Sequence, residues 1–155
     1  MAEAVDVVVI GAGVIGLAVG RALAKAGRDV FILEKNAAFG EETSARNSEV
    51  IHAGIQYKPG GVRASLAVKG RDMLYAFCAE HHVNHARCGK LLVATSAGDV
   101  PKLAALKEKA EKNGVADLTI ISAEDAAALE PGLRSFGAIS SPSSGIVDSH
   151  GLMLA

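Results

Sequence analysis

The sequence predicts an α/β fold with parallel strands, and three observations in the first 35 residues carry this prediction. Val5 to Ile10 reads VDVVVI, a β-branched run typical of a strand that is covered on both faces of a parallel sheet. Apolar residues then recur at helical spacing from Val14 to Lys25, and Gly27 stands where a left-handed residue would end that helix. Asp29 to Lys35 is again rich in β-branched and aromatic residues. The order strand, helix, strand predicts a doubly wound α/β sheet.

The next segments predict a loop and a long helix. Residues 36–61 are polar and rich in glycine without sustained periodicity, so we expect a long loop that holds at most a short helix. From Val62 to His81 apolar residues recur every three or four positions, which predicts an amphipathic helix. Its expected apolar stripe consists of Leu66, Gly70, Met73, Leu74, Phe77, Cys78 and His81.

The second half of the chain predicts short strands and further helices. Strands are expected at residues 90–95, 118–121, 137–140 and 146–148. A charged helix is expected at 101–113, ended by Gly114, and Ser122 with Asp125 resembles a capping box that opens another helix. The chain closes with the apolar run 151–155, which is typical of the beginning of a helix. We therefore expect these residues to be the N-terminal part of a longer protein.

Composition argues against several classes of function. Sixteen Lys and Arg against 17 Asp and Glu give a net charge of −1, and no run of like charge offers a surface for nucleic acid. The uncharged stretch Val7–Gly20 is 14 residues long. Because a helix needs roughly 20 residues to cross a bilayer, we expect no transmembrane segment. Glu3 and Asp6 stand where a secretory signal would carry basic residues, so we expect a cytoplasmic protein.

Residues 11–16 read GAGVIG and carry the first chemical signal, the pattern GxGxxG between a strand and a helix. In this pattern Gly11 would permit the tight turn, Gly13 would let the backbone approach a diphosphate, and Gly16 would let helix and strand pack closely. The helix N-terminus offers free N–H groups and a positive dipole potential to the anion. The pattern therefore predicts a Rossmann-like unit that binds a dinucleotide.

Glu34 lies 18 residues after Gly16, at the expected end of the second strand. A carboxylate at this place can accept hydrogen bonds from both hydroxyls of an adenosine ribose, and its charge would repel a 2′-phosphate, which argues against NADP. A solvated glutamate at a strand end would leave the glycine spacing unexplained. The motif does not separate FAD from NAD, since both contain the same ADP half.

Four segments then resemble one group of enzymes. They are residues 11–16 with Glu34-Lys35, RNSEVIHAGIQY at 46–57, RCGKLLVAT at 87–95 and SPSSGIVDSHGLMLA at 141–155. In this order they resemble the D-amino-acid-oxidase-like superfamily of FAD enzymes, and within it the L-2-hydroxyglutarate dehydrogenases and oxidases. The resemblance covers essentially the whole chain. It departs at Gln56, where the family has Tyr, and at Glu49, where some relatives have Gly.

The resemblance implies that the cofactor is FAD and which residues hold it. The residues that would line the diphosphate are Gly11, Gly13, Val14, Ile15 and Gly16. Glu34 and Lys35 would flank the adenosine ribose. The region between diphosphate and flavin would be contacted by Thr43, Ser44, Asn47 and Ser48. His52 would lie beside the isoalloxazine ring.

The resemblance also implies a division into domains. Residues 1–81 would be the N-terminal part of the FAD-binding domain, residues 82–140 part of an inserted α+β substrate domain, and residues 141–155 a segment that returns to the FAD-binding domain. A C-terminal segment beyond Ala155 would complete the flavin site. We therefore expect the isolated chain to retain FAD weakly and to show little or no turnover.

The implied activity is oxidation of a 2-hydroxy acid, such as 2-hydroxyglutarate, to the 2-oxo acid by hydride transfer to the flavin. His52 is the candidate catalytic residue that takes the hydroxyl proton, because an unperturbed imidazole has a pKa of roughly 6.5. A histidine that only packs against the flavin is the alternative. The implied electron acceptor is oxygen or a quinone.

Substrate carboxylates need cations or hydrogen-bond donors. The candidates are Arg46, Lys58, Arg63 and Lys90, although the sequence favours a solvated surface charge for each of them. Tyr57 either lines the substrate site or packs inside the protein.

Other chemistries find less support. His81, His82, His85 and Cys88 lie close in sequence but lack a fourth ligand at convincing spacing, so no metal site is predicted. No serine lies in a G-x-S-x-G elbow, which argues against a serine hydrolase. Two alternatives to 2-hydroxy-acid oxidation stay open. One is a related oxidase of an amino acid, a secondary amine or glycerol 3-phosphate, and the other is a catalytically incomplete dinucleotide-binding fragment.

Overall fold

The computed structural model describes residues 4–155, which form two compact units. Unit 1 comprises the chain up to Glu49 together with Asp148–Ala155, and unit 2 comprises Val50–Val147. Residues 1–3, where the sequence argument about a secretory signal begins, lie outside the described residues. The expected functional domains, with boundaries after residues 81 and 140, stay a prediction.

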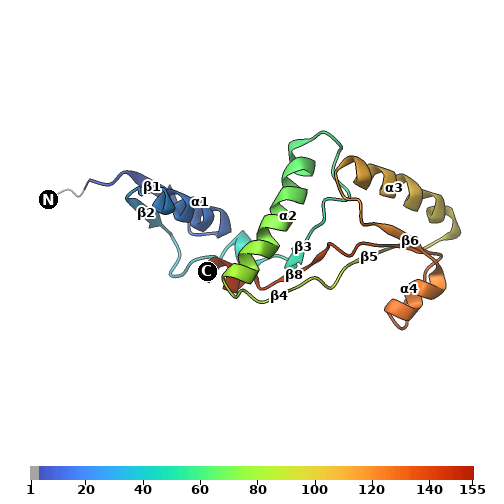
Figure 1. The fold of residues 1–155 in the computed structure, drawn as a ribbon. Coiled ribbons are helices and arrows are strands. Elements are labelled where there is room, and N and C mark those ends of the chain that lie inside the picture. Colours follow the sequence, from blue (N-terminus) through green and yellow to red (C-terminus); the bar gives the residue numbers. More distant parts are fainter. Residues whose placement is uncertain (1–3) are drawn as a thin grey trace. The chain divides into compact units, whose positions relative to one another are not determined.

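Unit 1 is built on a β-α-β motif, drawn in blue in Figure 1. Its main elements are β1 (Val7–Ile10), α1 (Val14–Lys25), β2 (Val30–Leu33), the 3₁₀ turn η1 (Thr43–Ala45) and α5 (Ser149–Leu154). Strands β1 and β2 pair in parallel, with Val7 opposite Val30 and Ile10 opposite Leu33. The expected Rossmann-like α/β class is confirmed.

Helix α1 ends as the sequence predicts. Gly27 has φ +77°, its amide donates to the Ala24 carbonyl at 2.9 Å, and the Arg28 amide donates to the Leu23 carbonyl at 3.1 Å. This is a Schellman motif, in which a left-handed residue lets two carbonyls at the helix end find donors. The crossover between β1 and β2 is therefore short and fixed.

The expected cover on both faces of the first strand is wrong. Val8 and Ile10 are 47% and 88% exposed, and β2 also leaves Leu33 55% exposed. Among the described residues the sheet has only these two strands. A β-branched run indicates a strand but does not by itself provide a second covering layer.

The return segment packs within unit 1 against the loop that follows β2. The rings of Phe39 and His150 stack with their centroids 5.2 Å apart. Gly40 has φ +73°, and a Cβ there would lie 2.6 Å from Cε of Met153. The expected loop 36–61 thus contains a 3₁₀ turn and a short strand, and part of it is fixed by packing against α5.

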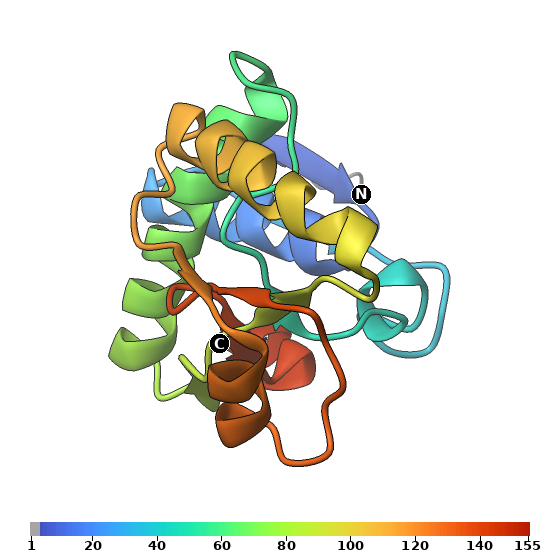
Figure 2. The same cartoon turned by 90° about the vertical axis from the view of Figure 1, so that its right-hand side faces the viewer.

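Unit 2 contains two three-stranded antiparallel sheets with helices beside them. The strands are β3 (Val50–Ile51), β4 (His85–Ala86), β5 (Leu91–Val93), β6 (Thr119–Ile121), β7 (Ala138–Ser140) and β8 (Gly145–Val147). The sheet orders are β3-β8-β4 and β5-β7-β6. The helices are α2 (Val62–Glu80), the 3₁₀ turn η2 (Ala97–Asp99), α3 (Val100–Lys112) and α4 (Ala123–Leu129). Figure 2 shows α3 and α4 on opposite sides of the second sheet.

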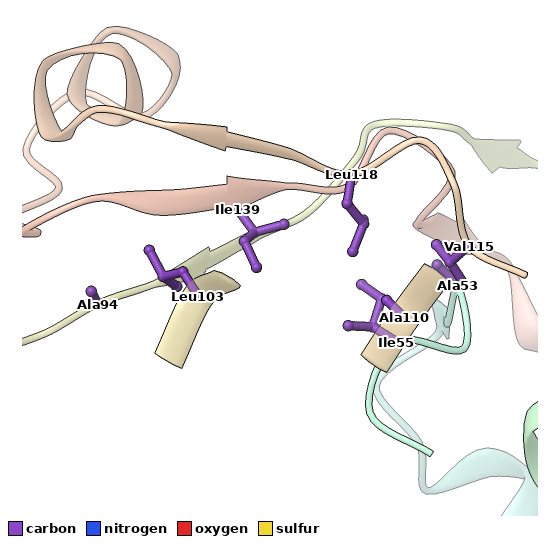
Figure 3. Packing of buried hydrophobic residues seen from close by; sticks show 8 residues of the cluster. All are labelled: Ala53, Ile55, Ala94, Leu103, Ala110, Val115, Leu118 and Ile139. Atoms are coloured by element: carbon purple, nitrogen blue, oxygen red, sulfur yellow. The ribbon is translucent and has the colours of Figure 1, made fainter. Parts of the chain in front are cut away.

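The core of unit 2 lies between α3 and the second sheet. Figure 3 labels its buried members, Ala53, Ile55, Ala94, Leu103, Ala110, Val115, Leu118 and Ile139. The expected helix at 101–113 and the expected strands around 118–121 and 137–140 supply four of the eight, namely Leu103, Ala110, Leu118 and Ile139. The predicted capping box is confirmed, because the Ser122 hydroxyl accepts from the Asp125 amide at 3.0 Å and the Asp125 carboxylate accepts from the Ser122 amide at 3.3 Å.

Helix α2 forms as expected, but the expected apolar stripe is wrong at three positions, because Leu66, Gly70 and Met73 are exposed. Leu66 and Met73 are 60% and 61% exposed, whereas Tyr75 and Cys78 are buried. The hydroxyl of Tyr75 donates to the carbonyl of Ser143 at 3.2 Å, so a polar contact determines part of the buried face. The spacing of apolar residues could not predict this hydrogen bond. Among residues 4–155, no helix is long and apolar enough to span a membrane.

Candidate cofactor-binding and substrate sites

The glycine loop of unit 1 has the geometry that its sequence pattern requires. Gly11 has φ +98°, which favours glycine. A Cβ on Gly16 would collide with the Gly11 carbonyl, so helix and strand approach each other as closely as only glycine permits. Gly13 is the N-cap residue of α1 and has no side chain with which to cap this end of the helix.

Glu34 turns towards the glycine loop. One of its carboxylate oxygens accepts from the Ala12 amide at 2.7 Å, and the other accepts from the Asn36 amide at 3.0 Å. These backbone donors, first Asn36 and then Ala12, hold the pKa of Glu34 below its ordinary value of 4.5. A carboxylate has about four lone-pair sites. The two bonds therefore leave capacity to accept hydroxyl groups of a ligand.

The 3₁₀ turn places Ser44 at the N-terminus of α1. Its hydroxyl accepts from the Val14 amide at 3.0 Å. The amides of Gly13 and Ile15 have no acceptor among the residues that the structure describes. Free amides at a helix N-terminus, beside a glycine turn and an acidic side chain, fit the diphosphate and ribose of an FAD or NAD molecule.

The remaining predicted cofactor residues of unit 1 occupy the loop after β2. The ammonium of Lys35 pairs with Glu42 at 2.7 Å. Thr43 lies in the same 3₁₀ turn as Ser44, and the exposed Ser48 follows it. Asn47 donates to the Ser44 carbonyl at 2.7 Å and so folds the loop back on itself.

Glu49 was not among the predicted site residues, although the structure gives it a distinct role. Its φ of +57° is unusual for a residue with a side chain. One carboxylate oxygen accepts from the amide and the hydroxyl of Ser149, at 2.9 and 2.8 Å, and these donors lower its pKa. Glu49 therefore ties the end of the loop to the beginning of α5. The only sequence feature that pointed to Glu49 was that some relatives have glycine at this position.

Unit 2 contains a cavity of about 110 Å³ in which several predicted residues meet. His52, Gln56 and Tyr57 line one part of it, and Lys90 and Ser144 line another. The cavity therefore gathers a histidine, a tyrosine and a lysine around a space that a ligand group can enter.

The cavity distinguishes Lys90 from the other candidate cations. Arg46 belongs to unit 1, and neither Lys58 nor Arg63 lines the cavity. Within residues 4–155 the Lys90 ammonium has no hydrogen-bond or ion-pair partner. Lys90 also borders a larger cleft of about 590 Å³ on the other side of β5, where Arg87 lies.

Two buried serine side chains beside the cavity are hydrogen-bonded to each other. The hydroxyls of Ser141 and Ser144 are 3.0 Å apart and fully buried. Within the described part of the chain, no group of three or more His, Cys, Asp or Glu residues is placed to hold a metal ion.

Comparison with known proteins gives consistent results. The model of a family described as FAD dependent oxidoreductase matches residues 6–155. The mitochondrial L-2-hydroxyglutarate dehydrogenase of Arabidopsis thaliana is 48% identical over 99% of this chain and 32% of its own length. The human mitochondrial enzyme of the same name is 40% identical over 97% of this chain and 33% of its own length. The chain thus spans about a third of the length of the curated relatives it matches.

Solved structures agree with this comparison. An L-α-glycerophosphate oxidase from Mycoplasma pneumoniae, reduced and with FAD bound, superposes with a TM-score of 0.90 at 27% identity. The match covers 99% of this chain and 42% of that protein. The expected superfamily and its cofactor, FAD, are confirmed at the level of the family.

The expected cytoplasmic location is wrong by the same comparison. The curated relatives from Arabidopsis, Nematostella and human are all named as mitochondrial enzymes. The sequence argument considered only the basic segment of a secretory signal. It therefore carried no information about mitochondria.

Proposed function

Because the chain belongs to the family of FAD-dependent oxidoreductases, we propose that it is part of an enzyme that binds FAD and oxidises a 2-hydroxy acid of the 2-hydroxyglutarate type to the 2-oxo acid. The observation that carries the proposal is the 2.7 Å hydrogen bond from Ala12 to Glu34, which sets an acidic side chain beside a glycine loop with free amides. The relatives named as L-2-hydroxyglutarate dehydrogenases supply the substrate class.

Unit 1 would hold the ADP half of the cofactor. The amides of Gly13 and Ile15 are the proposed donors to the diphosphate, and Glu34 is the proposed acceptor for the ribose hydroxyls. Val14 contributes less as a donor, because its amide is bonded to Ser44. Lys35 would flank the ribose while its ammonium stays on Glu42.

The loop after η1 would complete the cofactor site. Thr43, Ser44, Asn47 and Ser48 present hydroxyl and amide groups in one short segment, which suits the polar region between diphosphate and flavin. The bond from Asn47 to the Ser44 carbonyl keeps this segment compact.

The chemistry divides between cofactor and protein. FAD, when bound, supplies the acceptor for the hydride that leaves the substrate carbon. His52 is the proposed base, since its exposed ring lines the cavity and can take the hydroxyl proton. Oxidation then leaves a carbonyl on the former alcohol carbon.

Lys90 is the proposed partner of the distal substrate carboxylate. Within the described part of the chain the Lys90 ammonium has no carboxylate partner, so it is available to an anionic group that enters the cavity. Tyr57 would line the same site and contact the substrate through its ring or its hydroxyl. An oxidase of glycerol 3-phosphate is the second candidate, because the same cation could bind a phosphate and a glycerophosphate oxidase shares the fold.

The proposal is tested on the whole protein with its flavin. Under anaerobic conditions, 2-hydroxyglutarate should bleach the flavin absorbance, whereas glycerol 3-phosphate, proline and glycine should not. Bleaching by glycerol 3-phosphate alone would favour the second candidate, and bleaching by none of the four would contradict both. Readmission of oxygen or of a quinone then identifies the electron acceptor.

The role of His52 has its own test. His52→Ala should keep the flavin spectrum and lose about 100-fold or more in the rate of flavin reduction, as expected for removal of a general base. His82→Asn is the matched control, because His82 is exposed at the end of α2 with φ +54°, a conformation that Asn tolerates. Equal reduction rates in the His52 variant and in the control would assign His52 a packing role only.

A further inference from the structure

The last turn of α3 and its C-cap residue, Asn113, hold the segment 54–57 by three side-chain hydrogen bonds to its main chain. Nδ2 of Asn113 donates to the carbonyls of Gly54 and Tyr57, at 3.0 and 2.9 Å. Nζ of Lys109 donates to the carbonyl of Gln56 at 2.7 Å. Three of four consecutive carbonyls therefore bind side chains of one helix. Because this segment belongs to no helix or strand, these bonds replace the ladder that regular structure would supply.

Asn113 is suited to this contact by both its chemistry and its place in the helix. Its side-chain amide has two N–H donors in a fixed plane, and both are used. The side chain is 8% exposed, and its Oδ1 has no partner among the described residues. A reversed amide would point that oxygen at two carbonyls, so the contact admits one orientation only.

The backbone of Asn113 is fixed as firmly as its side chain. Gly114 has φ +87°, and the Val115 amide donates to the Ala110 carbonyl at 3.0 Å, which closes a Schellman motif at the end of α3. Val115 is 1% exposed and belongs to the core. The donor group thus projects from a rigid, buried helix end.

The other side of the same segment lines the cavity. Figure 3 shows Ile55 beside Ala110 in the core, and Ala53 is buried there as well. Tyr57, the last residue of the segment, and His52, two residues before its first, line the cavity. A shift of the main chain at 54–57 would therefore move both side chains.

We propose that Asn113 and Lys109 are positioning residues that determine where His52 and Tyr57 stand in the substrate cavity. The inference rests on the proposed function for its catalytic consequence, since it assumes that His52 and Tyr57 face the substrate. Its structural content, the attachment of segment 54–57 to α3, can be measured without any activity.

The test compares variants of the whole flavin-containing protein by two measurements. The first is hydrogen exchange of peptides that cover residues 52–58, and the second is the rate of flavin reduction at saturating 2-hydroxyglutarate. Asn113→Asp keeps the size of the side chain and removes both donors. Lys109→Met removes only the exposed hydrogen bond to the Gln56 carbonyl. We therefore expect it to fold even if Asn113→Asp does not. Lys112→Met is the matched control, because Lys112 is an exposed lysine of the same turn that, unlike Lys109, makes no hydrogen bond to the segment 54–57.

We expect faster exchange in both variants and not in the control. We expect the reduction rate to fall about 10- to 100-fold in Asn113→Asp, the cost of a displacement near the reacting atoms, and less in Lys109→Met, with FAD content unchanged. Exchange that stays unchanged in both variants would overturn the inference. Faster exchange with an unchanged reduction rate would also overturn it, because the bonds would then be structural only.

Failure of the proposed function would look different. The unsubstituted protein would itself not be reduced by 2-hydroxyglutarate, while the exchange comparison would still decide whether Asn113 and Lys109 hold the segment.

Discussion

The glycine loop of unit 1 and the segment 52–57 of unit 2 both carry proposed site residues, but they are fixed in different ways. The close packing of the loop is determined between near neighbours in the sequence, because a Cβ on Gly16 would collide with the carbonyl of Gly11. The segment is held by Asn113, which lies 59 residues from Gly54 and 56 residues from Tyr57. Backbone sterics fix the first region, and side-chain hydrogen bonds over a long sequence distance fix the second.

The difference bears on how each region tolerates substitution. The loop depends on the absence of side chains, so that almost any addition is harmful. The segment depends on the presence of particular donors, so that conservative replacements of distant residues are harmful. A search for site residues near a motif would find the first kind and miss the second.

The largest effect is expected from Gly16→Ala. The added Cβ would collide with the Gly11 carbonyl, which cannot move without breaking the turn, and we expect a loss of about 3 kcal/mol in the stability of unit 1 together with loss of FAD. Urea unfolding and flavin absorbance measure the two effects. Gly70→Ala is the control, because a Cβ on Gly70, within α2, would meet no atom of the described residues within 4 Å apart from the helix's own backbone. It should stabilise the protein by about 0.5–1 kcal/mol. Equal effects at both glycines would show that packing at the loop is not the determinant.

A smaller effect is expected from Ser122→Ala. This substitution tests whether a local contact in unit 2, the capping box of α4, contributes to stability as the local packing of the glycine loop does in unit 1. Loss of the bond from the Asp125 amide should cost about 1 kcal/mol of stability in urea unfolding. Ser65→Ala is the control, since its hydroxyl only donates to the Val62 carbonyl within the first turn of α2. If Ser65→Ala lowers the free energy of unfolding as much as Ser122→Ala, the capping box makes no specific contribution to stability.

The smallest effect concerns the pH dependence of Glu34. Its pKa is lowered in the folded protein, so its contribution to stability is present above the ordinary pKa of 4.5 and is lost as the pH falls through the lowered value. The difference in melting temperature between the unsubstituted protein and Glu34→Gln should therefore be constant near neutral pH and disappear in acid. Glu41→Gln, at an exposed glutamate of the following loop, should show no such trend. A difference that grows in acid would contradict the assigned bonds to Ala12 and Asn36.

Sequence alone predicted the elements whose determinants are local. Gly27 and Gly114 mark helix ends with positive φ, and Ser122 opens α4 as its spacing to Asp125 indicates. The orientation of Glu34 towards the glycine loop also agrees with its position after β2. In each case the responsible atoms lie within one supersecondary unit.

The features that sequence did not predict depend on distant partners. The exposure of Ile10 reflects which layers cover β1, and the burial of Tyr75 depends on the carbonyl of Ser143. The bonds of Asn113 to the segment 54–57 belong to the same class, since an Asn-Gly pair signals a helix end but not the carbonyls that its amide will meet.

The most direct test of the central claim is the affinity of the flavin-free protein for ADP, measured by calorimetry with and without Glu34→Gln. If the glycine loop holds the diphosphate and Glu34 holds the ribose, the substitution should weaken ADP binding about tenfold, or about 1.4 kcal/mol, and leave the binding of pyrophosphate unchanged. Equal affinity for ADP in the two proteins would contradict the assignment of Glu34 and with it the proposed cofactor site.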